Sequence, residues 1–408
     1  MFSPFWSTLI FGVAILFPFA ATPQGKNGGS LNYDKELGSP ADGRFRPNAS
    51  AGWREAYLPV AFPSSHSANL LQLRNGDLLC FWFSGTWEGE SDVGIVVSRL
   101  AKGSQQWSAP QVVDHRPGES YQNPVPFEAP DGTVWLIHTT QPAGRGQAKS
   151  NVLVAKSRDG GKTWAPPTVL FDNPGAYVRG ALLITPKGDW MLPMYVTPSV
   201  GILQGAESNY SVVKISSDKG ASWQECAIPD SKGLVQPTVV RLNDGTYKAF
   251  FRSRWADFIY QSTSRDECSW APPQKTLMPN NNSSVQAAKL ANGHLVIAFN
   301  NASAPKPDKT PQAGPRKPLT VALSADNGQT WPWVSDVEAG VPDGRELPSN
   351  PLSKDSPGRE EYSYPSILRT PDGKITLAYT YQRYTIKTVK FDEEWIKKGK
   401  TAGSFKGN

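Results

Sequence analysis

Four arginines stand beside apolar stretches of this sequence, where a cationic side chain is unexpected. Arg179, Arg252, Arg254 and Arg383 each adjoin a run of β-branched and aromatic residues. Burying a guanidinium group is costly unless an anion accompanies it. Arginine is also the side chain that binds a carboxylate through two parallel hydrogen bonds. We therefore expect at least two of the four to bind a carboxylate, which either the protein or a ligand supplies.

A histidine and two tyrosines add groups that could transfer protons. His66 lies four residues before the first of these apolar runs, and Tyr362 and Tyr364 lie just before the last. A tyrosine can act as a base or a nucleophile when a neighbouring arginine or carboxylate tunes its pKa. Other polar side chains at the ends of apolar runs are expected to contact a ligand: Glu88, Asn282, Gln286 and Asn300.

These side chains are far apart in the sequence, and a repeated motif indicates the scaffold that could bring them together. The segment 157–164, with the sequence SRDGGKTW, returns in similar form at 216–223 and 324–331, and a degenerate copy lies at 264–270. In such an Asp-box the Asp and Ser side chains bond backbone amides across a tight turn. Glycine supplies positive φ, and the Trp covers the turn. We interpret the boxes as structural braces of a repeated unit.

Six strand-turn-strand units share an apolar run interrupted by a glycine-containing hairpin signal. They cover residues 70–83, 126–140, 182–196, 239–253, 287–301 and 367–381, and a second hairpin follows each. Two hairpins make a four-stranded blade, so we predict an all-β, six-bladed β-propeller with Asp-box hairpins. A seven-bladed propeller is the alternative, with its extra blade in the leader or near 302–318 and 338–360. Because the first strand of each blade lines the channel, the candidate residues should meet on one face.

The remaining segments give the predicted boundaries. Residues 1–21 are apolar and end in small residues, as in a secretory signal peptide, and residues 22–52 form an extended leader. A single propeller domain follows at 53–398, and residues 399–408 form a basic tail. Acceptor sequons predict N-glycosylation of a secreted, extracellular protein at Asn48, Asn209, Asn281, Asn282 and Asn301.

Cysteine content and charge narrow the function classes. Of three cysteines, Cys226 and Cys268 are expected to bridge neighbouring repeats, which leaves Cys80 as a buried thiol. The net charge of +6 is spread along the chain without a basic block beyond 397–400, which argues against nucleic-acid binding. No later segment reaches transmembrane length. We expect a monomer that binds neither nucleic acid nor a membrane.

Four motifs resemble a known family: SHSANLL at 65–71, FRSRWAD at 251–257, NNNSSVQ at 280–286 and YSYPS at 362–366. They are similar to motifs of the sialidase-like propellers with Asp-box repeats, and particularly of their BNR-repeat-like branch. The resemblance covers about 53–396 and implies the propeller fold. Exo-sialidases of this family are expected to carry a Phe-Arg-Ile-Pro motif, three arginines on the sialic acid carboxylate, an Asp acid/base and a Tyr/Glu nucleophile pair. Here the corresponding segment, 62–66, reads FPSSH, so the first arginine is missing.

The chain also resembles secreted fungal lyases that cleave the L-rhamnose-α-1,4-D-glucuronate linkage of gum arabic and arabinogalactan side chains. That resemblance implies β-elimination, which releases L-rhamnose and leaves a 4,5-unsaturated glucuronate. Elimination needs the glucuronate carboxylate to be neutralised, by Arg252 as the catalytic arginine or by Arg179 or Arg254. It also needs a base for the C5 proton and an acid for the O4 oxygen. Tyr364 and His66 are the candidates, in either order.

Two other functions stay open at this point. Hydrolysis requires two carboxylic acids flanking the bond, and Glu88, Asp257 and Glu361 are available, so an exo-glycosidase of sialidase or rhamnosidase type is the alternative. A non-catalytic glycan-binding propeller would instead use Trp87 and Trp255 as platforms. The chemistry requires no cofactor, although asparagine, carbonyl and carboxylate oxygens would suit Ca²⁺. The expected partner is an acidic plant polysaccharide, a uronate-bearing arabinogalactan.

Overall fold

The computed structural model describes residues 39–144, 146–198, 205–305, 310–340 and 360–408. All of these belong to the larger of two compact units, Tyr33–Asn408, and the smaller unit, Met1–Asn32, lies outside the described residues. The predicted signal peptide at 1–21 and most of the predicted leader are therefore outside the described part of the chain.

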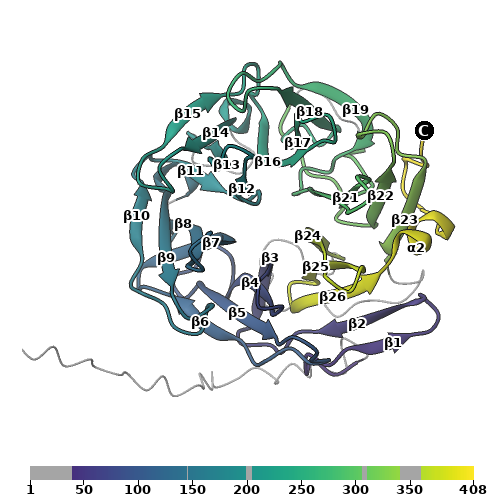
Figure 1. Ribbon diagram of the computed structural model, residues 1–408, viewed down its shortest axis with the longest axis horizontal. Coiled ribbons are helices and arrows are strands. Elements are labelled where there is room, and N and C mark those ends of the chain that lie inside the picture. The colour runs from purple at the N-terminus through teal and green to yellow at the C-terminus, as the bar shows by residue number, and fades with distance from the viewer. Residues whose placement is uncertain (1–38, 145, 199–204, 306–309, 341–359) are drawn as a thin grey trace, which may run out of the picture. The chain divides into compact units, whose positions relative to one another are not determined.

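Six antiparallel sheets are arranged as blades around a common axis, which confirms the predicted six-bladed propeller (Figure 1). The first blade consists of β3 (Ser64–Gln72), β4 (Leu78–Gly85), β5 (Gly94–Leu100) and β6 (Gln111–Asp114). The second consists of β7 (Glu119–Glu128), β8 (Val134–Pro142), β9 (Asn151–Ser157) and β10 (Thr168–Phe171). The third is β11 (Ala176–Val178), β12 (Leu183–Ile184), β13 (Trp190–Val196), β14 (Tyr210–Ser216) and β15 (Gln224–Ala227).

The fourth blade consists of β16 (Leu234–Arg241), β17 (Tyr247–Ser253), β18 (Phe258–Ser264) and β19 (Gln274–Pro279). The fifth consists of β20 (Gln286–Lys289), β21 (Leu295–Asn300), β22 (Leu319–Ser324) and β23 (Trp333–Glu338). The sixth joins β24 (Tyr362–Arg369), β25 (Ile375–Tyr381) and β26 (Thr385–Phe391) to β2 (Trp53–Tyr57) and β1 (Arg46–Asn48). Two 3-10 turns, Gln147–Lys149 and Ala206–Ser208, and the short helix α2 (Glu393–Lys398) complete the described structure. The described residues contain no seventh sheet, so the seven-bladed alternative is wrong.

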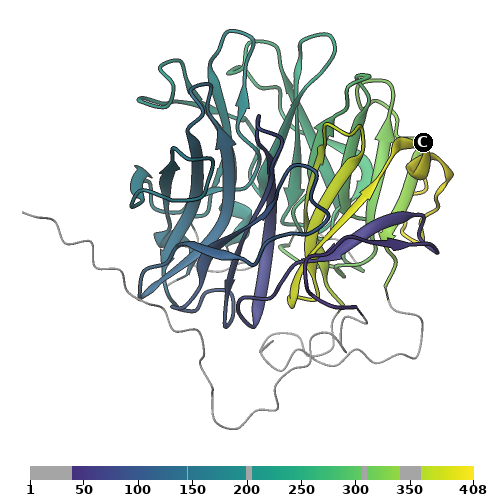
Figure 2. The same ribbon diagram turned by 60° about the horizontal axis from the view of Figure 1, so that its bottom comes forward.

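The ring is closed by strands from the two ends of the chain. Strand β2 pairs with β26, with Arg54 opposite Lys390, and β1 pairs with β2 (Figure 2 shows these purple strands beside the yellow last blade). This closure gives β26 a neighbour on both sides and joins strands from the two ends of the chain in one sheet. The predicted leader boundary at residue 52 is therefore too late, because the sheet already includes Arg46–Asn48.

The predicted basic tail at 399–408 is not a free extension. Phe405 is buried in the apolar cluster of the fourth and fifth blades, and Asn301 donates to its carbonyl at 2.8 Å and accepts from its backbone N–H at 2.9 Å. Because burying a phenylalanine contributes roughly 1.5–3 kcal/mol, these contacts fix the chain end against the propeller. The propeller domain thus extends through the segment that we predicted to be a tail.

The local sequence accounts for the blades. All six predicted hairpin glycines have positive φ: Gly76, Gly132, Gly188, Gly245, Gly293 and Gly373. In the Asp-box at 157–164, Asp159 accepts hydrogen bonds from the backbone N–H groups of Lys162 (3.0 Å) and Thr163 (2.9 Å), and the N–H of Gly161 donates to Ser157 Oγ at 2.8 Å. In the degenerate copy, Asp266 still accepts from Ser269 N at 2.6 Å. The boxes are braces, as predicted.

The second strand of each blade lies in the core between neighbouring blades. Strand β4, for example, is buried along its whole length, as expected for a strand with both faces covered. Cys80 is a buried free thiol within it, and Cys226 and Cys268, the predicted pair, form a disulfide between the third and fourth blades with a Cα–Cα distance of 5.0 Å.

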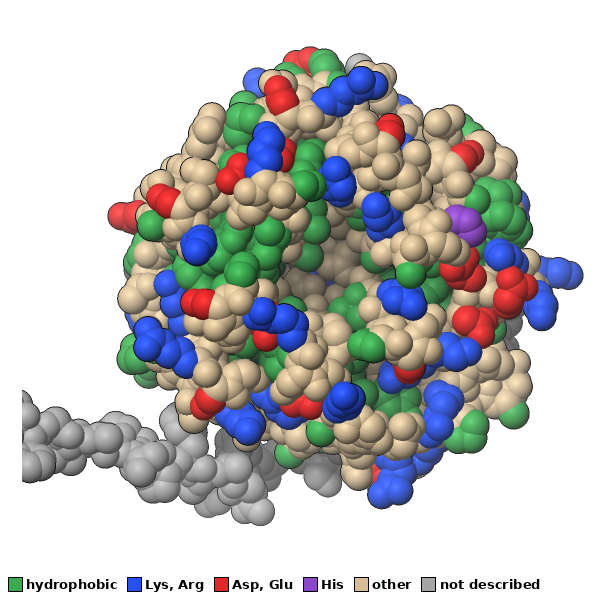
Figure 3. Space-filling model, viewed as in Figure 1, with side chains coloured by type: hydrophobic (Ala, Val, Ile, Leu, Met, Phe, Trp, Pro, Cys, Tyr) green, Lys and Arg blue, Asp and Glu red, His purple; other side chains and the backbone are tan. Residues whose placement is uncertain are grey.

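Side chains of both charge signs surround a central hollow on the face in Figure 3, without a large basic patch.

Candidate functional site

The channel-lining segments share a local distortion that aims their side chains at the axis. Non-glycine residues with φ between 50° and 64° occur at Ser67, Asn123, Gln236, Asn282 and Tyr364. In four of these segments, the exception being that of Asn282, the strand pairing shifts register around the same residue. Such bulges redirect side chains, and each positive φ costs about 1–3 kcal/mol and persists only because its surroundings enforce it. Strain repeated around one axis marks this region as a candidate site.

Tyr364 stands at the centre of the cluster, on the bulge of β24. Arg252, at the end of β17, donates from Nη1 to the phenolic oxygen at 2.6 Å, and Gln236 donates from Nε2 to it at 3.4 Å. Arg252 also donates from Nε to Asn282 Oδ1 at 2.7 Å and from Nη1 to Gln236 Oε1 at 3.1 Å. Neither hydrogen-bond partner of the phenol is a carboxylate.

Guanidinium groups surround the ring of Tyr364. The Cζ atoms of Arg179, Arg316 and Arg252 lie 5.4, 5.5 and 5.8 Å from its centroid. Burial alone would raise the pKa of Tyr364, but the charges of Arg252 and Arg316 outweigh burial and hold the pKa below its ordinary value. The phenol therefore loses its proton more readily than that of an ordinary tyrosine, which favours a role in proton transfer.

His66, on the bulge of β3, packs against Tyr364 with ring centroids 4.2 Å apart. Its Nδ1 is 2.8 Å from Thr380 Oγ1, whereas its Nε2 is buried and has no hydrogen-bond partner among the described residues. Burial, together with the positive charges of Arg383 and Arg316, holds the pKa of His66 well below its ordinary value. The imidazole is therefore neutral, and its buried Nε2 is left without a hydrogen-bond partner among the described residues.

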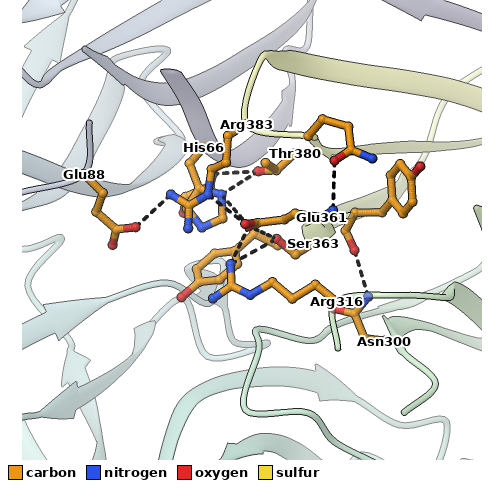
Figure 4. A network of polar contacts seen from close by, with 12 residues as sticks. His66, Glu88, Asn300, Arg316, Glu361, Ser363, Thr380 and Arg383 are labelled. Atoms are coloured by element: carbon orange, nitrogen blue, oxygen red, sulfur yellow. Dashed lines mark hydrogen bonds and ion pairs between the residues drawn. The ribbon is translucent and has the colours of Figure 1, made fainter. Parts of the chain in front are cut away.

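A chain of alternating charges lies beside His66 (Figure 4). Arg383 contacts Glu88 Oε2 from Nη1 at 2.8 Å and Glu361 Oε1 from Nε at 3.0 Å, and Arg316 pairs with the same oxygen of Glu361. Burial would raise the pKa of Glu361, but Arg316 and Arg383 outweigh it and lower the pKa to about 2. Glu361 is therefore a fixed anion and cannot serve as a general acid near neutral pH.

Arg316 was missed by the sequence analysis. It lies in the segment between β21 and β22, which bridges three blades. Gln312 N donates to the carbonyl of Arg254 (2.9 Å), Gly314 N to that of Asn281 (3.0 Å), and Tyr362 N to that of Arg316 (3.0 Å). This segment follows the second strand of the fifth blade. Loops after second strands are expected to lie on the functional face, so the same reasoning would have identified Arg316 as a candidate.

Two predicted ligand-binding arginines, Arg179 and Arg254, hydrogen-bond to other parts of the protein. Arg179 donates from Nη1 to the carbonyl of Ala68 (3.1 Å), from Nη2 to that of Pro365 (2.9 Å) and from Nε to Ser284 Oγ (3.1 Å), so it cross-links blades. The hydrogen-bonding pattern orients the side-chain amide of Asn209 with its oxygen toward Arg254. In that orientation Nε and Nη2 of Arg254 each donate to the amide oxygen at 3.1 Å. Burial lowers the pKa of each arginine to about 10, and neither pairs with a described carboxylate. Neutral protein groups accept the hydrogen bonds of these two guanidinium groups, and contact of either arginine with a ligand stays a prediction.

Three further predicted contacts also belong to the framework. Tyr362 packs in the core beside Tyr381 with centroids 5.2 Å apart, and Asn300 donates to the carbonyl of Tyr362 at 2.8 Å. Gln286 accepts from the N–H of Ile367 at 2.5 Å. These side chains contact protein groups in the structure, and their contact with a substrate stays a prediction. His66, Tyr364, Arg252, Asn282, Glu88 and Arg383 do converge around the channel.

The glycosylation prediction also needs correction. Four of the five acceptor asparagines are buried, with exposed fractions of 0–3%: Asn209, Asn281, Asn282 and Asn301. The amide nitrogen of Asn281, for example, donates to the carbonyl of Pro315 at 2.7 Å, and a glycan on that atom would displace this bond. Asn48 is partly exposed and stays a predicted acceptor.

The described residues hold no group of three or more His, Cys, Asp or Glu side chains placed to bind a metal ion. Ca²⁺ binding therefore stays a prediction from the sequence. None of the helices in the described ranges is long and apolar enough to cross a membrane.

Comparison with known proteins agrees with this architecture. The profile of a family described as BNR repeat-like domain matches residues 76–377. No curated protein sequence matches the chain. Among solved structures, the chain is similar to the Hadza microbial sialidase Hz136, with a TM-score of 0.65, 15% identity, and coverage of 82% of this chain and 66% of that one. This chain thus spans just under two thirds of that sialidase.

Two other solved structures are similar. The NanB sialidase from Streptococcus pneumoniae has a TM-score of 0.62 and 14% identity, with 81% of this chain and 69% of that chain covered. The intramolecular trans-sialidase from Ruminococcus gnavus has a TM-score of 0.63 and 14% identity, with 84% and 97% covered. At these identities the similarity shows that the chain shares the sialidase-like β-propeller fold.

Proposed function

Since this chain belongs to the BNR repeat-like domain family, we propose that it is a glycan-acting enzyme whose channel site catalyses β-elimination at a uronate. The substrate that we propose is the L-rhamnose-α-1,4-D-glucuronate end of gum arabic and related arabinogalactans. The observation that carries the proposal is the hydrogen bond from Arg252 to the phenolic oxygen of Tyr364 at 2.6 Å, on a tyrosine without a carboxylate partner.

Tyr364 is the better base of the two candidates. Its pKa is lowered mainly by Arg252 and Arg316 against the effect of burial, so its phenolate is accessible nearer neutrality. The pKa of His66 is also lowered, which for an imidazole means a weaker affinity for a proton. We therefore assign the abstraction of the C5 proton to Tyr364.

Arg252 and Arg316 are suited to hold the substrate carboxylate. Nη2 of Arg252, and Nε and Nη2 of Arg316, donate to none of the described residues, so both arginines have N–H groups free for a ligand. When the C5 proton leaves, negative charge develops on the carboxyl group, and paired arginines stabilise that charge. Arg316 thus takes the role predicted for Arg179 and Arg254.

The phenolate oxygen of Tyr364 takes the C5 proton, and the C5–H electron pair moves into the carboxyl system as an enolate. That pair returns to form the C4–C5 double bond as the C4–O4 bond breaks. The new Tyr364 phenol gives its proton to the departing oxygen, which leaves on L-rhamnose. His66 Nε2, buried beside the tyrosine without a protein partner, offers a hydrogen bond to the sugar.

Hydrolysis is supported less well by the same residues. A retaining or inverting glycosidase needs a carboxylic acid that holds a proton, whereas Glu361 is held ionised by two arginines and its pKa is about 2. Asp257 accepts from Ser253 Oγ at 2.6 Å and from Tyr260 at 3.0 Å, and so belongs to a separate network. The tyrosine of a sialidase-type nucleophile pair would need a glutamate, and Gln236 lies here instead.

We also propose that the protein is secreted and acts outside the cell on acidic plant polysaccharide, on the basis of the predicted signal peptide. The test is incubation of the protein with gum arabic while ultraviolet absorbance of the conjugated double bond, free rhamnose and free sialic acid are all measured. Rising absorbance with released rhamnose supports elimination. Released sugar without absorbance would return the proposal to a sialidase-like or rhamnosidase-like hydrolase.

A further inference from the structure

A second hollow lies on the rim of the propeller, away from the channel. It is bounded by the start of β23, the outermost strand of the fifth blade, the end of α2, and the folded-back chain end (β23 and α2 lie at the outside of the ring in Figure 1). Its volume is about 260 Å³, which suits a single sugar residue. The lining residues, which define what we call the C-terminal pocket, are Pro332, Trp333, Val334, Lys397, Gly399, Lys400, Thr401 and Lys406.

The C-terminal pocket is cationic and has an aromatic wall. Three lysines line it, and no Asp or Glu is among its lining residues. Lys397 Nζ lies 5.6 Å from the ring centroid of Trp333 and donates to Glu394 at 2.8 Å, and Lys406 Nζ donates to the carbonyl of Thr401 at 2.6 Å. Lys400 is exposed and pairs with no described acidic residue.

A structural role for these lysines accounts for only part of the arrangement. Lys397 and Lys398 lie in the last turn of α2, where positive charge favours the helix C-terminus. Lys398, however, does not line the pocket, whereas Lys400 and Lys406 line it from outside the helix. Trp333 also keeps part of its surface exposed at the pocket wall. Helix stabilisation therefore does not explain the two lysines beyond α2, and Trp333 packs part of its surface on the core of the fifth and sixth blades while leaving the rest exposed.

We propose that the C-terminal pocket is a secondary binding site for one uronate residue of an acidic polysaccharide, the substrate class on which the proposed function rests. Trp333 supplies a flat apolar surface for the face of the sugar ring, and Lys400 and Lys406 pair with the uronate carboxylate. A polymer held at the rim would raise the local concentration of its chain ends at the channel. The pocket thus provides attachment, and the channel provides the chemistry.

The first test is a binding titration of the full-length protein with polygalacturonate. Trp333→Ala and Lys400→Gln should each weaken binding about fivefold. Lys398→Gln removes the same charge from the same end of the chain outside the pocket, and should change binding less than about twofold. Because Lys400 is exposed, its substitution leaves the fold intact even if Trp333→Ala is unstable. Equal weakening by Lys398→Gln and Lys400→Gln would overturn the proposal.

The ligand can be varied in the same titration. Carboxyl-reduced polygalacturonate keeps the sugar rings and loses the charge, and should bind much more weakly than the parent polymer. Inorganic polyphosphate keeps charge and lacks sugar rings, so its binding should not respond to Trp333→Ala. If the parent polymer also binds independently of Trp333, the pocket is not a sugar site.

The two proposals can fail separately. If wild-type protein forms no unsaturated uronate while Trp333→Ala and Lys400→Gln still weaken polymer binding, only the proposed reaction is wrong. If wild-type protein forms unsaturated uronate while both variants bind the polymer like wild type, only the secondary site is wrong.

Discussion

The phenolic oxygen of Tyr364 lies 2.6 Å from Nη1 of Arg252, and both side chains are almost fully buried at the propeller axis. This contact links the strained bulge of β24 to the end of β17 in another blade. A phenol paired with a buried cation loses its proton more readily than a free one. The pair therefore provides a proton-transfer group at the centre of the site.

Replacing Tyr364 by phenylalanine should remove the base and leave the packing intact. We expect kcat on gum arabic to fall by about 10²–10⁴, with a smaller change in KM, because general base catalysis contributes that much. Tyr362→Phe is the matched control, since Tyr362 lies two residues away but packs between blades. Initial rates of double-bond formation measure both variants. A Tyr364→Phe protein with more than a tenth of wild-type kcat would show that another group takes the proton.

Substitution of Arg252 by glutamine should change the pH dependence of the reaction. Arg252 helps to lower the pKa of Tyr364, so its loss raises that pKa and less phenolate is present at neutral pH. The rising limb of the kcat/KM profile should move to higher pH, with part of the lost rate recovered there. A uniform loss of rate at every pH would instead indicate that Arg252 only binds substrate or supports the fold.

Glu361 should make stability depend on pH in the acid range. Its pKa in the folded protein is about 2, below the ordinary value of 4.5, so its ionised form stabilises the fold above the ordinary value. That contribution, at most about 3 kcal/mol, should be lost as pH falls from about 4.5 to about 2. Thermal melting of wild type and Glu361→Gln across this range measures it. The two curves should converge toward pH 2, and parallel curves would contradict the assignment.

Substitution of Lys387 should show how much the closure of the ring contributes to stability. This buried lysine of β26 lies 3.2 Å from Glu55 of β2 and 2.6 Å from Glu338 at the end of β23. Lys387→Met leaves two carboxylates without their cation, so we expect a loss of about 3–5 kcal/mol in the free energy of unfolding. Lys390→Met on the same strand removes a more exposed pair with Asp372 at 3.6 Å and should cost less than about 1 kcal/mol. Denaturant unfolding compares them, and equal losses would contradict the closing role.

The repeated local features of the chain could be predicted from sequence because each depends on neighbours in the chain. Gly76 and Gly132 mark hairpins through their own backbone conformation, and Asp159 bonds amides only three and four residues away. The pairing of Arg54 with Lys390 could not be predicted in this way. It joins strands from opposite ends of the chain, and nothing in the residues of β2 specifies that partner.

The candidate site was predictable in outline but not in detail. The positions of His66 and Tyr364 follow from the rule that segments before the first strand of each blade face the channel. Whether an arginine binds a ligand depends on which acceptors surround it. Arg179 donates to two backbone carbonyls and a serine, whereas Arg252 donates to an asparagine, a glutamine and the phenol of Tyr364, yet both look alike in the sequence.

The measurement that tests the central claim most directly is the mass of the uronate-ended product after digestion of gum arabic. Elimination removes O4 with the rhamnose, so the new terminal glucuronate should be one water lighter than the hydrolysis product and should carry a C4–C5 double bond. We predict the lighter product from wild-type protein, and the same product formed at least about a hundredfold more slowly by Tyr364→Phe. A terminal glucuronate of full mass would contradict elimination and show that the site hydrolyses its substrate.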